Sequence, residues 1–258
     1  MKTRLPYLLI LVAFLGLILN GCKTTGCTDP TAIDYDPDAT ESGDCVYPNL
    51  MLHFHPLVGG EDLNFDNTFT IGGVAVKFSV VQFYVSAAAV SGNGVADENE
   101  DTYLLVKAGT MNYPVGQITA GSKESVRFSV GLDSTTNHAD PTLYESDNPL
   151  ALQSPSMHWS WDKGYQFIKI EGMVDTDNDG TPDAAMEFHI GKDSNLRTIS
   201  LDISQSADME MFMVNIDYDL AKLFDGIDLS TEYITHTGDF PALATKVIEN
   251  VPGTFSIQ

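Results

Sequence analysis

Short runs of alternating apolar and polar residues recur between residues 50 and 218, and this pattern constrains the fold more than any other. Alternation with a period of two places the apolar side chains on one face of a β-strand. Gly, Asn, Asp and Pro, which favour turns, separate the runs. Such spacing predicts an all-β domain, an antiparallel β-sandwich or a barrel, and we expect the sandwich. The predicted strands cover residues 50–55, 74–85, 103–107, 125–130, 166–174, 185–189, 198–203 and 210–218.

Helical patterning is sparse and is confined to the end of the chain. Residues 220–224 predict one or two turns, and residues 241–249 predict a short amphipathic helix. Residues 49–258 are numerous enough for one large domain with its own core. The sequence contains no Gly-rich phosphate loop, no Gly-x-Ser-x-Gly elbow and no evident Cys-His nucleophile pair. We therefore expect a protein that is not an enzyme.

The N-terminus has the pattern of an export signal. Lys2 and Arg4 precede an almost unbroken apolar run over residues 8–19, which is too short for a stable membrane-spanning helix. The run ends in Leu-Asn-Gly-Cys22, which resembles the bacterial lipobox. We expect residues 1–21 to be a lipoprotein signal peptide and Cys22 to carry the lipid that anchors the protein to a membrane. Lys at position 23 gives no inner-membrane retention signal, so the outer membrane is the expected location, facing either the periplasm or the surface.

The chain is strongly acidic. Its formal net charge is −23, and removal of residues 1–21 leaves 11 basic against 36 acidic side chains. Such a charge repels nucleic acids and anionic headgroups, so neither is an expected partner. The carboxylates either provide solubility or supply ligands for divalent cations.

Two cysteines remain once Cys22 is assigned to the lipid. Cys27 and Cys45 form an even pair in an oxidising compartment, which predicts one disulfide. Residues 26–47 also resemble a short Cys-Thr-Asp…Gly-Asp-Cys-x-Tyr module of surface proteins from Bacteroidetes-type bacteria. So short a segment cannot bury a core, so the disulfide would have to stabilise it. We expect residues 22–48 to form this module and residues 49–258 to form the main domain.

Alternate acidic residues in the segment 175–183 predict a calcium loop. Acids occupy positions 1, 3, 5 and 9 of the loop, and a glycine at position 6 allows a sharp turn. The flanking runs are strand-like, which places the loop at the tip of a hairpin. The alternative is a solvated acidic turn. The expected Ca²⁺ ligands are Asp175, Asp177, Asp179, Asp183 and the backbone carbonyl of Thr181.

The segment 157–172 (Met-His-Trp-Ser-Trp-Asp-Lys-Gly-Tyr-Gln-Phe-Ile-Lys-Ile-Glu-Gly) contains both tryptophans of the chain. Together with His53-Phe-His55 and Met-Glu-Phe-His189-Ile-Gly191, it resembles the MbnP-like copper-binding protein family. The resemblance spans essentially residues 50–258. It implies a periplasmic or surface copper protein with a β-sandwich-type fold. In some members a di-haem partner enzyme oxidises one tryptophan to kynurenine near the copper.

Carried over to this chain, the resemblance implies copper at His55 and His189, followed by His53 and His158 as further ligands. The oxidised residue would be Trp159 or Trp161. His138 and His236 lie in loop-like contexts, where solvated histidines are more common than ligands. The expected function is therefore to hold or scavenge copper, and a calcium-stabilised surface binding or adhesion module without a working copper site is the alternative. The same residues have a simpler interpretation, in which the histidine pair binds no metal and the tryptophans pack in an ordinary core.

Overall fold

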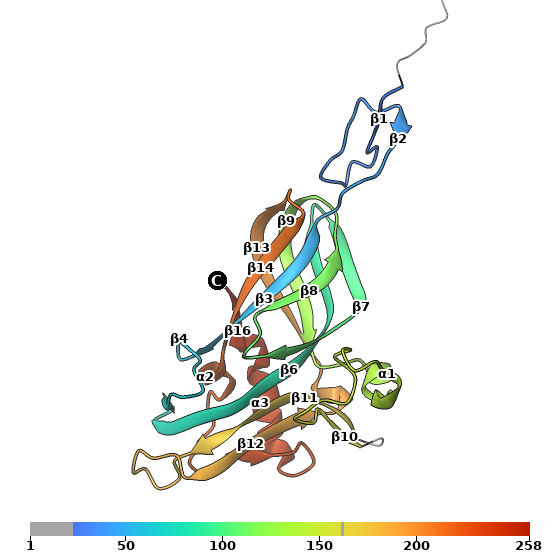
Figure 1. Ribbon diagram of the computed structural model, residues 1–258. Coiled ribbons are helices and arrows are strands. Elements are labelled where there is room, and N and C mark those ends of the chain that lie inside the picture. The colour runs from blue at the N-terminus through green and yellow to red at the C-terminus, as the bar shows by residue number, and fades with distance from the viewer. Residues whose placement is uncertain (1–22, 161–162) are drawn as a thin grey trace, which may run out of the picture.

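The computed structural model describes residues 23–160 and 163–258, which form two packed sheets and a small N-terminal unit (Figure 1). The larger sheet has nine strands. Six of them are paired in the order β13 (Arg197–Ala207), β9 (Gly121–Val130), β6 (Val74–Gly92), β11 (Gly164–Val174), β12 (Ala184–Gly191) and β15 (Ile234–Thr235). Of the other three, β5 (Phe69–Ile71) and β7 (Val95–Lys107) pair with β6, and β10 (His158–Ser160) pairs with β11. The smaller sheet has the order β16 (Phe255–Ile257), β14 (Met211–Asp219), β3 (Asn49–Val58) and β4 (Glu61–Asp62), with β8 (Asn112–Gln117) beside β3. The sheets do not close, so the predicted sandwich is confirmed.

Alternation along the strands directs apolar side chains between the two sheets. In β3 every second residue is buried, among them Leu52 and Phe54, while His53 and His55 are only partly buried. All eight predicted strands are present, and several extend beyond the predicted limits. The long β6 joins the sheet together because it pairs with β5, β7, β9 and β11.

The helices lie where the sequence places them, with one addition. α2 (Leu220–Leu223) and α3 (Pro241–Thr254) confirm the two predicted helices, and α3 continues for five residues beyond the predicted end. The buried face of α3 belongs to the main core. A further turn, α1 (Ser134–Asn137), was not predicted, because four residues with no apolar stripe give no helical periodicity.

Two strand pairs of the sandwich are parallel, while the other described pairs in its two sheets are antiparallel. β14 pairs with β3 over its whole length, and β15 pairs with β12. The members of each pair are far apart in the sequence, so neither pair requires a tight hairpin turn. Periodicity within one strand carries no information about such long-range partners.

A second apolar cluster covers part of the opposite face of the nine-stranded sheet. Tyr84, Tyr165 and Phe167 point away from the main core and are fully buried. The segment between β9 and β11, which contains α1, η1 (Pro141–Leu143) and β10, supplies the residues that cover them, Leu132, Leu150 and Met157. This additional layer buries part of the outer face of the nine-stranded sheet, so polar residues on that face can also be buried.

The N-terminal unit is a two-stranded parallel sheet of β1 (Thr25–Gly26) and β2 (Glu41–Ser42), and it lies beyond one end of the sandwich (Figure 1). The predicted disulfide between Cys27 and Cys45 is confirmed. Cys27 and Ala32 are the buried apolar residues of this unit, which shows how small its core is.

Among the described residues, no helix is long and apolar enough to cross a membrane. The predicted signal peptide over residues 1–21, the lipid-bearing Cys22 and Trp161 lie outside the described residues.

Candidate metal centre

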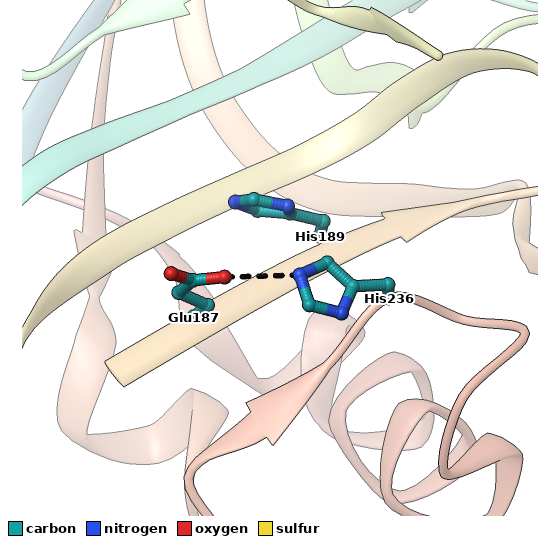
Figure 2. Close-up of side chains that lie close together, drawn as sticks. All are labelled: Glu187, His189 and His236. Carbon is teal, nitrogen blue, oxygen red and sulfur yellow. Dashed lines mark hydrogen bonds and ion pairs between the residues drawn. The ribbon is translucent and has the colours of Figure 1, made fainter. Parts of the chain in front are cut away.

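Two side chains of β12 and one from the following edge of the sheet form a compact group of potential metal ligands. Glu187 and His189 are two residues apart, so both point away from the core that buries Phe188. His236 follows β15 directly and lies beside them (Figure 2). One ligand atom from each of the three residues lies within 4.8 Å of the others.

Backbone pairing holds the three residues in place. β15 runs parallel to β12, with Phe188 opposite Thr235. The residues that follow this pair, His189 and His236, therefore also lie close together. The Thr237 hydroxyl donates to the carbonyl of His189 at 3.0 Å and accepts from the N–H of Gly191 at 3.0 Å. The imidazole rings of His189 and His236 consequently have centroids 4.9 Å apart.

Burial of His189 favours its neutral form. Burial lowers its pKa below the usual value, and the Lys169 ammonium adds to this effect, which outweighs the opposing contact with Glu171. Burial would raise the pKa of Glu171, but hydrogen bonds from Lys169 and His189 hold it below the usual value. Nε2 of His189 lies 2.8 Å from Glu171 Oε1, and a carboxylate can only accept there. In the neutral ring, Nδ1 then carries the lone pair.

The group has the donors that copper accepts. Nε2 of His236 lies 3.0 Å from Glu187 Oε2, and a metal ion can replace the proton that this pair shares (Figure 2). Two imidazoles and a carboxylate suit copper as well as zinc. Glu171 provides the outer hydrogen bond by which proteins usually orient a metal-binding histidine.

Trp159 lies in a pocket next to this group. The pocket has a volume of about 700 Å³, and its walls include Trp159, His138 and His236. The indole ring lies directly over Gly191, where a Cβ would be 2.5 Å from a ring carbon. Glycine at this position is therefore what allows the ring to reach the end of β12.

The structure does not bring His55 and His189 together, which corrects the predicted convergence. His55 lies on the outer face of the five-stranded sheet, between Asp217 at 2.9 Å and Asp62 at 3.2 Å. His189 lies on the outer face of the nine-stranded sheet. The packed core between the two sheets, which are typically about 10 Å apart, separates these faces. Because the sequence does not say which sheet a strand joins, spacing along the chain could not reveal this.

The remaining predicted residues are dispersed. His53 is beside His55 on the same outer face, with Nδ1 at 2.7 Å from Asn112 Oδ1. His158 packs its ring against Tyr165, with centroids 4.8 Å apart, and burial lowers its pKa. Trp159 is the one predicted aromatic residue that the structure describes near the metal-ligand group.

Sequence reasoning missed Glu187 and assigned His236 to the solvent. A signal for Glu187 was present, because Glu-x-His in a strand places both side chains on one face. No comparable signal existed for His236, which comes 47 residues after His189 and is brought close by a two-residue strand.

The acidic loop lies at the tip of the β11–β12 hairpin, as predicted. Ligand atoms of Asp175, Asp177 and Asp179 lie within 4.8 Å of one another. Asp175 is buried and accepts backbone hydrogen bonds from Asn178 and Gly180 at 2.8 Å each. Asp183 does not belong to this group, since its carboxylate accepts from the amide and the hydroxyl of Thr176 instead. The N–H of Thr181 donates to Asp179, which closes the turn.

Comparison with known proteins agrees with this architecture. A family model described as MbnP matches residues 47–238. The solved structure of MbnP from Methylosinus trichosporium aligns with a TM-score of 0.54 and 17% sequence identity, covering 71% of this chain and 80% of that chain. At this identity, the likeness demonstrates the common fold. No curated protein matches the chain. The match of the family model over most of the sequence places this chain in the MbnP family, and this membership supports a copper-related role.

Proposed function

We propose that this protein is a non-enzymatic copper-binding lipoprotein of the cell envelope that holds copper at Glu187, His189 and His236. The observation that carries the proposal is the approach of three ligand atoms to within 4.8 Å of one another. It agrees with the copper-related role that the family supports. Copper is the cargo of this site, and the function is to hold or scavenge it outside the cytoplasm.

The surroundings of the group favour metal binding at neutral pH. A histidine must be neutral to bind a metal, and burial lowers the pKa of His189. Glu171 orients that ring, while Lys169 balances the charge of Glu171 at 2.8 Å. His236 is about one-third exposed, which leaves the group open to ions from the solvent.

Replacing either histidine should weaken copper binding at this group. We expect His189→Ala and His236→Ala each to weaken copper binding by at least about tenfold, because even the loss of an outer partner of a ligand costs 10–100-fold. Copper content after equilibrium dialysis, measured by elemental analysis, gives the result. His55→Ala is the matched control, since His55 lies on the other sheet, between Asp62 and Asp217. Full copper loading of both His189→Ala and His236→Ala, with native circular dichroism, would refute the assignment.

Trp159 is the residue that we propose as the site of oxidation to kynurenine by a di-haem peroxidase-like partner enzyme. The support is its place in the pocket that also contains His236. A second support is its contact with Gly191, two residues from His189. A kynurenine in this pocket would add a carbonyl and an amine next to the copper ligands.

The acidic loop supports the second candidate function, a calcium-stabilised surface binding module. Asp175, Asp177 and Asp179 would bind Ca²⁺ through oxygens at roughly 2.3–2.6 Å. We expect calcium to raise the melting temperature, because an ion that binds only the folded state stabilises it. Differential scanning calorimetry with calcium and with chelator measures this, and Asp177→Asn/Asp179→Asn should remove the difference. Melting curves that change with neither calcium nor chelator would indicate a solvated acidic turn that binds no calcium.

Membrane anchoring through Cys22 is a further part of the proposal, and it rests on the lipobox-like sequence at residues 19–22. Cys22→Ser should move the protein from the membrane fraction to the soluble fraction, because the diacylated thiol would be missing. Cell fractionation and immunoblotting measure this. Cys27→Ser is the control, since it changes a cysteine in the same segment and leaves the anchor intact. Membrane retention of Cys22→Ser would contradict lipidation.

A further inference from the structure

The outer face of the five-stranded sheet carries thioethers where a solvated strand face usually carries polar side chains. Met51 on β3 and Met211 and Met213 on β14 alternate with buried residues and therefore face away from the core. His53 lies on the same face, two residues after Met51. We call Met51, His53, Met211 and Met213 the Met/His patch.

The pairing of β3 with β14 brings this patch together. Met51 is directly opposite Met213 in the parallel register, so their backbones are about 4.8 Å apart. Met211 precedes Met213 by two residues and His53 follows Met51 by two residues, so the two lie about 6.6 Å from the Met51–Met213 pair in opposite directions along the strands. Met51 and Met211 also line one surface hollow of about 590 Å³. Methionine has three rotatable bonds, so the sulfur atoms can adjust to a common ion.

The hydrogen bond of His53 leaves one ring nitrogen suited to binding a metal. Nδ1 lies 2.7 Å from the side-chain oxygen of Asn112 on the neighbouring β8, and an amide oxygen only accepts. Nδ1 therefore carries the proton in the neutral ring, and Nε2 carries the lone pair. Donation of the second ring N–H to a carbonyl is the usual arrangement of a metal-binding histidine.

We propose that the Met/His patch is a second metal site, which binds a soft monovalent cation, Cu(I), through the sulfur atoms of Met51 and Met213 and Nε2 of His53. Thioethers select Cu(I), whereas imidazole with carboxylate, as in the Glu187–His189–His236 group, also suits Cu(II) and zinc. Asp217, two strand positions beyond Asn215, adds negative charge to the same face. The two sites lie on the outer faces of different sheets, so the patch binds its ion independently of the proposed function.

Silver(I), a redox-stable soft cation, is a suitable probe in solution. We expect titration of the full chain with Ag⁺ to shift the NMR signals of the Met51 and Met213 methyl groups as one equivalent binds. Met51→Leu/Met213→Leu should weaken this binding by at least about tenfold, because leucine keeps the volume but has no sulfur. Methionine-to-leucine exchange conserves volume, so the double variant should fold.

Two variants separate the patch from other sites. Met173→Leu changes a comparably exposed methionine on the other sheet and should leave Ag⁺ affinity at the patch unchanged. His189→Ala/His236→Ala should abolish binding at the proposed copper site and leave the methyl shifts of Met51 and Met213 intact. The proposal is overturned if Ag⁺ shifts neither methyl signal in the wild type, or if the double leucine variant binds Ag⁺ with unchanged affinity.

Discussion

Replacing Phe54 with alanine is expected to lower the free energy of unfolding by about 3–5 kcal/mol. The ring of Phe54 has no exposed surface and lies at the centre of the sandwich. It contacts Phe83 and Phe128 of the nine-stranded sheet, with ring centroids 5.8 and 5.6 Å away. Tyr113 and Phe255 on the strands of the smaller sheet pack against it as well. Alanine would leave a cavity between the two sheets, where neither sheet can collapse without moving its partner.

Thermal and urea denaturation measure this loss. A destabilisation of 1 kcal/mol lowers Tm by roughly 2–4 °C in a domain of this size, so Tm should fall by about 6–20 °C. Phe240→Ala is the control, because Phe240 is 65% exposed and its loss should have little effect. Equal changes in Tm for the two variants would show that Phe54 is not the centre of the core.

Removing Asp97 is expected to destabilise the protein by about 3–5 kcal/mol, because a buried ammonium would lose its counter-charge. Asp97 Oδ2 lies 2.6 Å from Lys123 Nζ, and the two side chains are 10% and 3% exposed. Asp97 also accepts from the backbone N–H of Thr119 at 2.9 Å. In Asp97→Ala, Lys123 keeps the hydroxyl of Thr119 as its neutral partner.

A double-mutant cycle separates the free energy of the Asp97–Lys123 interaction from the other effects of each substitution. Lys123→Met in the Asp97→Ala background should recover much of the lost stability, because it removes the unpaired charge and keeps the volume. Glu98→Ala is the control next in sequence, since its partner Arg127 is 42% exposed and such surface pairs contribute about 0–1 kcal/mol. Urea denaturation of the four proteins gives the coupling energy. Equal effects of Asp97→Ala and Glu98→Ala would contradict the role of burial.

Local patterns were sufficient for much of the fold. The two-residue period placed the strands because side chains alternate between faces in any strand, whichever neighbours it acquires. β3 illustrates this, since the residues expected to point inward, such as Leu52 and Phe54, are buried. The hairpin that joins β11 to β12 was predictable because its acidic, glycine-containing turn separates two alternating runs. The Cys27–Cys45 disulfide followed from counting cysteines.

The candidate metal centre was predictable only in part. His189 was identified from its motif, and Glu187 could have been, since both belong to the same strand. The pairing of His189 with His55 is wrong for a reason that lies outside any local pattern. Each histidine points outward from its own strand, as alternation requires, but the strands belong to sheets on opposite sides of the core.

The sequence by itself determined which residues face outward, which cysteines pair and where the chain turns, because these properties depend on neighbours a few positions apart. Only the tertiary structure decided which outward residues meet. His236 approaches His189 because β15 adds to the free edge of β12 in parallel, and Met51 meets Met213 because β14 adds to β3 in the same way. Parallel partners are joined by a long crossover connection and not by a tight turn, so the chain between them leaves no periodic trace of the contact.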